Sequence, residues 1–205
     1  MNNSFVSTVC TARVDLGFLI EATSTGRRNI QQVVRFVRET VRRFTISSRA
    51  TRVGVVTFAS RSRKIIRFSG AYTRRRIYNA IGRIRALGRG TRLGRALTYA
   101  RLNLFRGKPK CGRRRVLIVV TTGGRSLDRV RKPAEALKGA GVEIFMVGRI
   151  GRSLLRVTTD RKHVFVVGST RFLSIVRTLK DRICYSPGKL TINEWDLVQQ
   201  GDKIR

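Results

Sequence analysis

The feature that most constrains this chain is an apolar run that changes abruptly into a polar one, Val14 to Gly26. Its first half, Leu16 to Ile20, is short and mostly apolar, as expected of a strand buried on both faces of a parallel sheet. The residues that follow carry a carboxylate and hydroxyls, at Glu21, Thr23, Ser24 and Thr25. Ligands of open α/β sheets bind at the carboxyl ends of the strands, so this loop is the first candidate site. Donors that are all oxygens favour a hard cation such as Mg²⁺.

Strand and helix patterns alternate along the rest of the chain. The predicted strands are 16–20, 51–60, 63–68, 116–120, 142–147 and 163–167. The predicted helices are 26–44, 73–87, a segment from the Gly88–Gly94 loop to about Phe105, 133–141, and 172–183. The link between the second and third strands is short, which favours an antiparallel edge pair. Right-handed crossovers elsewhere predict an α/β fold with a doubly wound, mainly parallel sheet and helices on both faces.

The length of 205 residues suits one well-buried core rather than two equal domains. We expect a leader at 1–9, the domain at 10–184, and a linker or the start of another module at 185–205, where the periodic pattern is lost. The N-terminus lacks the basic and apolar regions of a signal peptide, and no apolar stretch approaches the ~20 residues that span a bilayer. If the protein is secreted, this chain is expected to be a fragment or a mature form.

Three cysteines are present, at Cys10, Cys111 and Cys184. Cys10 precedes the first strand and Cys184 ends the last helical pattern, so a bridge between them would suit an oxidising compartment. The alternative is three free thiols in a cytosolic chain. With a bridge, Cys111 is a free thiol or an intermolecular link.

The charge is unusual: 45 Lys+Arg against 11 Asp+Glu give a net charge of +34. Such a field attracts polyanions, including nucleic acid, glycosaminoglycans and anionic lipid. The basic clusters predicted to bind them are Arg27, Arg28, Arg42, Arg43, Arg74, Arg75, Arg76, Arg113, Arg114 and Arg115. No recognition-helix or zinc-finger spacing or stacking platform is evident, so a nucleic-acid function would be electrostatic alone. A solvated basic surface with no selected ligand is the competing interpretation.

Patterns of enzyme chemistry are missing from the sequence. There is no G-x-S-x-G motif and no plausible acid–base pair, so we expect no enzyme. The segment from Gly88 to Gly94 lacks the GK[ST] ending of a phosphate-binding P-loop and does not follow a strand. His163 is the single histidine and is expected to be structural.

Several motifs together resemble the von Willebrand factor type A (vWA) domain, over roughly Cys10 to Cys184. They are VDLGFLI with its polar loop, RVGVVTFAS, GTRLGRAL, RRVLIVVTT-GG and PAEALKGAGVEIFMVG, in the family's order and spacing. The chain is most similar to the extracellular matrix branch, of the matrilin and collagen VI type. The bracketing cysteines are also similar to that branch.

The resemblance implies a metal-ion-dependent adhesion site (MIDAS) that binds Mg²⁺ where the strands end. Its residues correspond here to Glu21, Thr23, Thr25, Thr91 and Thr122. Only Thr91 keeps the family's usual residue. Thr23 and Thr25 retain hydroxyls with more restricted rotamers, Glu21 reaches one methylene farther than aspartate, and Thr122 removes a carboxylate. We therefore expect a degenerate site in which Mg²⁺ binding is weak or lost and the threonines hydrogen-bond loop backbone.

These observations predict a secreted, non-enzymatic adhesion module that binds an extracellular matrix protein such as collagen, or a partner carboxylate. The alternative is a polyanion binder that uses the arginine surface, with glycosaminoglycan or nucleic acid as its ligand.

Overall fold

The computed structural model describes residues 9–23, 27–69, 71–108, 112–168 and 171–185. In that part of the chain, a sheet of strand order β3-β2-β1-β4-β5-β6 is parallel throughout except for the pair β2 and β3. The strands are β1 Val14–Glu21, β2 Arg52–Phe58, β3 Ser62–Ile66, β4 Arg114–Gly124, β5 Val142–Ile150 and β6 Val164–Val166. The predicted α/β fold with one antiparallel edge strand is confirmed.

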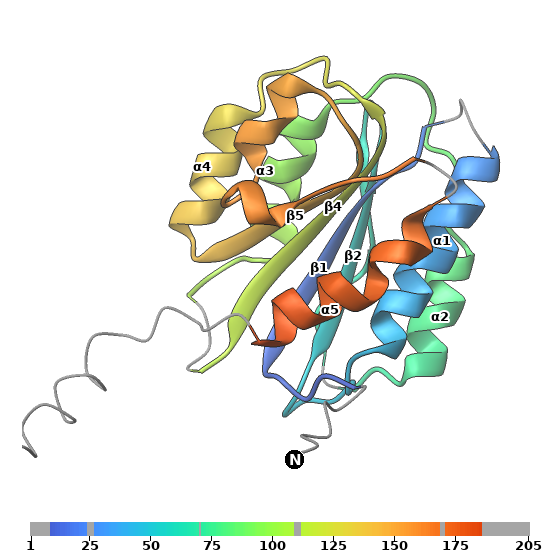
Figure 1. Ribbon diagram of the computed structural model, residues 1–205, viewed down its shortest axis with the longest axis vertical. Coiled ribbons are helices and arrows are strands. Elements are labelled where there is room, and N and C mark those ends of the chain that lie inside the picture. Colours follow the sequence, from blue (N-terminus) through green and yellow to red (C-terminus); the bar gives the residue numbers. More distant parts are fainter. Residues whose placement is uncertain (1–8, 24–26, 70, 109–111, 169–170, 186–205) are drawn as a thin grey trace, which may run out of the picture.

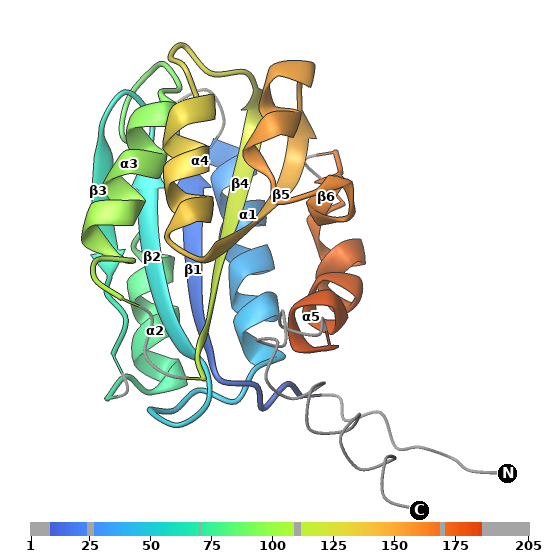
Figure 2. The ribbon, with the colours of Figure 1, turned by 90° about the vertical axis from the view of Figure 1, so that its left-hand side faces the viewer.

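Helices cover both faces of this sheet (Figures 1 and 2). Helices α1, α2 and α5 lie on one face, and α3 and α4 lie on the other. Their bounds are α1 Arg27–Arg42, α2 Arg74–Gly82, α3 Leu93–Asn103, α4 Arg131–Gly139 and α5 Val176–Tyr185. Three 3₁₀ turns follow α4 in the chain: η1 Arg152–Val157, η2 Arg161–His163 and η3 Phe172–Ile175. Within the described residues, no helix is both long enough and apolar enough to cross a bilayer.

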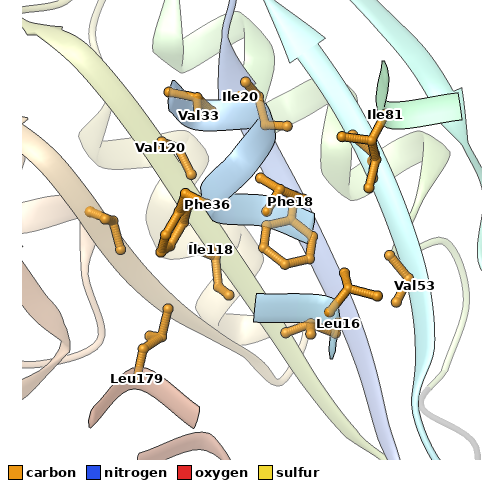
Figure 3. Close-up of a cluster of buried hydrophobic side chains, with 14 of the residues drawn as sticks. Leu16, Phe18, Ile20, Val33, Phe36, Val53, Ile81, Ile118, Val120 and Leu179 are labelled. Carbon is orange, nitrogen blue, oxygen red and sulfur yellow. The ribbon is translucent and has the colours of Figure 1, made fainter. Parts of the chain in front are cut away.

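Strand β1 is buried along its whole length because both of its faces are covered. Successive side chains of a strand point to opposite faces. Phe18 and Ile20 belong to the apolar cluster under α1, which also contains Phe36 (Figure 3). Leu19 belongs to the opposite cluster, with Leu97 of α3. The apolar run that defines β1 in the sequence therefore serves two cores.

Several elements differ from the predicted bounds, and two of the differences lie at one edge of the sheet. Helix α2 ends at Gly82 rather than near Leu87, because the chain turns so that the Leu87 N–H donates to the Ala22 carbonyl at 2.8 Å. Strand β4 continues to Gly124, beyond its apolar core, and pairs with Ile150 after a register shift. As a result, the segment around Leu87 and the end of β4 both lie at the same edge of the sheet. We call that edge, formed by the carboxyl ends of β1, β4 and β5 and the loops after them, the crest.

The other end of the sheet is closed covalently. Cys10 and Cys184 form a disulfide with a Cα–Cα distance of 5.7 Å, which confirms the predicted bridge. Arg114, at the start of β4, donates to the Ile183 carbonyl next to it. Cys111 lies outside the described residues, as do 1–8 and 186–205 of the predicted flanking segments.

Candidate functional site

Glu21 is the last residue of β1 and lies at the centre of the crest, only 3% exposed. Its carboxylate accepts four hydrogen bonds. Oε1 accepts from Thr91 Oγ1 at 2.9 Å. Oε2 accepts from Thr121 Oγ1 at 2.7 Å and from the backbone N–H groups of Thr122 at 2.8 Å and Gly123 at 3.1 Å. The buried charge is thus held by neutral dipoles from two loops.

This set of donors matches the capacity of the acceptor. A carboxylate offers about four lone-pair sites on its two oxygens. An unpaired buried carboxylate is very costly, whereas one with several hydrogen bonds is stable. The hydrogen bonds of Glu21 therefore connect the end of β1 to the end of β4 and to the loop that contains Thr91.

The predicted metal residues are only partly brought together. Thr91 contacts Glu21 through its hydroxyl, but Thr122 contacts it through its backbone N–H. Thr23 is half-buried, two positions after β1, and Thr25 lies outside the described residues. The hydroxyl of Thr121 was not predicted to contribute. Strand parity could have found it, because Thr121 and Thr122 point to opposite faces of β4.

A second crest contact involves Ser126 and Asp128, which the sequence did not indicate. Asp128 accepts from the backbone N–H groups of Gly94 at 2.9 Å and Arg95 at 2.8 Å, and Ser126 accepts from that of Leu93 at 3.0 Å. These side chains cap α3 from a distant loop, since its own N-cap residue makes no side-chain cap bond. The N–H groups after the glycine-rich loop are thus occupied, which agrees with the rejection of a P-loop.

Gly94 makes this cap possible. A Cβ atom at this position would collide with the backbone carbonyl oxygen of Arg129. Helix α3 can therefore approach the loop after β4 closely only with glycine here.

A hollow of about 490 Å³ lies beside Glu21 on the crest. Asn29, Thr122 and Arg149 line it together with Val166, which is 69% exposed. In the part of the chain that the structure describes, the Arg149 side chain has no hydrogen-bond or ion-pair partner. The crest hollow therefore presents a positive charge beside Thr122, one of the residues to which the resemblance assigned a metal.

The predicted basic clusters on α1 and α2 are mostly exposed, unlike the one at the start of β4. Arg75 and Arg76 are exposed on α2, and Arg76 lies over the Tyr72 ring at 5.0 Å. Arg74 is exposed too, although its Nη2 donates to the Phe44 carbonyl at 3.0 Å. Arg42 is exposed on α1 and pairs with Glu39 at 3.0 Å, while Arg43 is half-buried. Arg27 and Arg28 begin α1.

The cluster of Arg113, Arg114 and Arg115 requires a correction. Arg113 and Arg115 are 7% and 6% exposed, and burial lowers the pKa of both guanidinium groups. Arg113 donates to the carbonyls of Ser48 and Ala50 and lies 3.7 Å from Asp15. Arg115 donates to the Gly107 carbonyl at 2.8 Å. These guanidinium groups are themselves buried and bonded to backbone carbonyls, so they are not available to a polyanion.

His163 also has a structural environment. Its Nε2 lies 2.6 Å from Glu143 and its Nδ1 lies 2.6 Å from Asp160. Arg114 pairs with the other oxygen of Glu143. Burial alone lowers the pKa of His163, but the two carboxylates outweigh it and the pKa is raised. The pKa values of Glu143 and Asp160 are lowered because the bonds to His163, and Arg114 for Glu143, outweigh desolvation.

The relatives that resemble this chain include vitrin, a collagen VI chain and cochlin. Vitrin from Mus musculus is 36% identical over 143 residues, which cover 69% of this chain and 22% of vitrin. The collagen alpha-5(VI) chain from Homo sapiens is 29% identical over 196 residues, covering 90% of this chain and 8% of the collagen chain. Cochlin from Cavia porcellus is 32% identical over 143 residues, covering 69% of this chain and 26% of cochlin. This chain thus spans about a quarter or less of each relative.

Solved structures share the fold. Proximal thread matrix protein 1 from the mussel byssus, with a zinc occupied MIDAS motif, matches with a TM-score of 0.77 at 24% identity. The match covers 86% of this chain and 47% of that one. The manganese-loaded Plasmodium vivax TRAP protein matches with a TM-score of 0.64 at 15% identity, covering 84% and 75%. A family model for the von Willebrand factor type A domain matches residues 15–177, and the chain therefore belongs to the vWA domain family.

Proposed function

We propose that this domain is a non-enzymatic adhesion module of the matrix type whose MIDAS is degenerate and whose crest binds without metal. One observation carries this proposal: both oxygens of Glu21 are already occupied by the four donors at the crest. Three of these donors saturate Oε2, so Oε1, which also accepts from Thr91, is the one oxygen of Glu21 with a lone-pair site left for a cation.

The remaining donors do not fit Mg²⁺ either. This ion demands near-ideal octahedral geometry and is usually held by one or two carboxylates. Thr122 supplies no charge, and its backbone N–H points to Glu21. Among the described residues, no group of three or more His, Cys, Asp or Glu side chains is placed to hold a metal. The net charge of +34 further disfavours a divalent cation.

A partner carboxylate fits the crest hollow better than a cation does. Arg149 offers a planar guanidinium that can bind a carboxylate through two parallel hydrogen bonds. Asn29 and Thr122 line the same hollow with amide and hydroxyl groups, and the exposed Val166 offers an apolar contact. The ligand is then an acidic side chain of a matrix protein such as collagen.

The setting that we propose is extracellular. The disulfide between Cys10 and Cys184 persists in oxidising compartments. The similarity to a collagen VI chain supports a matrix location. We place the domain at residues 10–184, between the two bridged cysteines. The flanking segments then act as a leader and a linker.

Binding to immobilised collagen, measured by surface plasmon resonance, tests this function. We expect equal binding in Mg²⁺ and in EDTA, and about tenfold weaker binding by Arg149→Gln, which loses a charge-assisted contact. Arg177→Gln is the matched control, because Arg177 is exposed on α5 and does not line the crest hollow. Binding that EDTA abolishes would contradict a degenerate site.

A second function is binding of polyanions. The net charge of +34 and the exposed arginines on α1 and α2 favour it, whereas Arg113 and Arg115 do not. The two functions use different surfaces, so one domain can have both. Sensitivity to salt distinguishes polyanion binding from the more local crest contact.

A further inference from the structure

A hollow of about 650 Å³ lies between the start of α4 and the turn η1. Helices α3 and α4, the second of which lines this hollow, cover one side of the sheet (Figure 2). Five of the residues that line the hollow are cations: Arg129, Arg131, Lys132, Arg152 and Arg156. None of them belongs to the basic clusters that the sequence singled out. We call this site the α4–η1 hollow.

Most of these cations have no internal partner. Arg129, Lys132, Arg152 and Arg156 are exposed, and within the described residues their side chains make no hydrogen bond or ion pair. Arg131 differs, because its Nε pairs with Glu135 at 2.8 Å. Four positive charges thus converge on one concave surface with their hydrogen-bond donors unused.

One acidic residue, Asp128, also lines the hollow, but its oxygens are engaged elsewhere. They accept from the N–H groups of Gly94 and Arg95 at the start of α3 and from the Ser126 hydroxyl. Asp128 therefore lowers the local positive charge by one unit without pairing with the four cations.

The groove between α1 and α2 is a weaker anion site. Arg38 Nη2 donates to the Tyr78 carbonyl, and Arg85 Nη1 donates to the carbonyls of Gly82 and Ile84. Glu39 lines this groove as well and adds a negative charge. Positive charge is present there, but fewer of its donors are available.

The chemistry of the α4–η1 hollow selects among polyanions. No aromatic side chain is among the described residues that line it, so nucleic-acid bases find no stacking surface. Guanidinium forks match the planar or tetrahedral oxygens of carboxylate and sulfate groups. Several cations that line one concave surface fit charges that repeat along a chain.

We propose that the α4–η1 hollow binds a segment of sulfated glycosaminoglycan. The proposal rests on the polyanion function above and gives that function a site. Each sulfate that is neutralised releases a condensed counterion. With about four contacts and the slope known for single-stranded polyanions, affinity falls roughly fiftyfold between about 50 and 200 mM salt.

Heparin titrated calorimetrically into two variants of equal charge tests the site. The hollow variant carries Arg129→Gln, Lys132→Gln, Arg152→Gln and Arg156→Gln. The control variant carries Arg35→Gln, Arg75→Gln, Arg76→Gln and Arg83→Gln, all exposed positions on α1, on α2 or at its end. We expect the hollow variant to lose about tenfold or more in affinity and the control variant about threefold or less.

The outcomes separate the site from the function. If the wild-type domain binds no heparin, both fail. If it binds and the two variants lose affinity equally, or the control loses more, the function stands and the site is wrong.

Desulfated heparin, duplex DNA and polyglutamate are the competing ligands. Tighter binding of DNA or polyglutamate at the hollow would overturn the assignment to a sulfated glycan. Equal melting temperatures of the variants exclude unfolding as the cause.

Discussion

Thr121 Oγ1 donates a 2.7 Å hydrogen bond to Oε2 of Glu21, although the two residues are 100 positions apart in the chain. The bond joins the ends of two adjacent parallel strands, β1 and β4. It also turns Glu21 toward protein donors at the position where the vWA resemblance implies a metal ligand. Stability and metal binding at the crest thus depend on the same carboxylate.

Removal of that hydroxyl is expected to destabilise the domain. Thr121→Val keeps the shape of the side chain but leaves a buried carboxylate with one donor fewer, which costs about 1–3 kcal/mol. Urea denaturation measures the change in the free energy of unfolding. Thr178→Val, at an exposed position on α5, is the control and should change it by less than about 0.5 kcal/mol.

Metal binding should be recoverable at the crest. Glu21→Asp shortens the side chain, so its carboxylate withdraws from the Thr122 and Gly123 N–H groups, and Thr122→Asp restores a second charge. We expect the double variant to bind Mg²⁺ in calorimetry, each single variant to bind more weakly, and the wild type to give no heat. If none of the variants binds, the loops rather than the ligands disable the site.

Stability should depend on pH through His163. Its pKa is raised in the folded state, so protonation stabilises the fold below the unfolded value of 6.5, and this contribution is lost as pH rises through the folded pKa. Glu143 and Asp160 have lowered pKa values, so their contribution is lost as pH falls through those values. We expect His163→Gln to destabilise more at about pH 5.5 than at about pH 9. An equal loss at both pH values would show that the charge of His163 contributes nothing.

Substitution of Arg113 should lower stability and substitution of Arg75 should not, although both residues belong to predicted polyanion clusters. Arg113→Ala leaves the Ser48 and Ala50 carbonyls without this donor, while Asp15 keeps its ion pair with Arg52. We expect a cost of about 3 kcal/mol in stability and a heparin affinity that is nearly unchanged. Arg75→Ala removes an exposed charge and should change stability by less than about 0.5 kcal/mol. Chemical denaturation and heparin titration of both variants check this contrast.

The fold could be predicted because its signals are local. The apolar run of β1 and the stripe on α1 each require only neighbouring residues to recognise. The early end of α2 could not be predicted in this way. It depends on a bond between Leu87 and Ala22, and on the packing of Gly82 against Arg38, which appears only once α1 and α2 lie together.

The location of the candidate site could be predicted, but its hydrogen-bond pattern could not. Glu21 and Thr91 could be singled out from sequence motifs, and the structure brings them together. The backbone N–H of Gly123 could not be found, because a main-chain donor leaves no trace in residue type. The arginines at 113 and 115 look like a surface cluster in sequence, but the register of β4 places them against buried carbonyls.

The disulfide lies at the opposite end of the sheet from the crest, where the first strand begins and the last helix ends. In a longer polypeptide, a pulling force on the two flanking segments would enter and leave the domain through Cys10 and Cys184. The load would then pass along the covalent bridge rather than through the hydrogen bonds between strands. The strands and the crest would then carry little of the load and would keep their shape under tension.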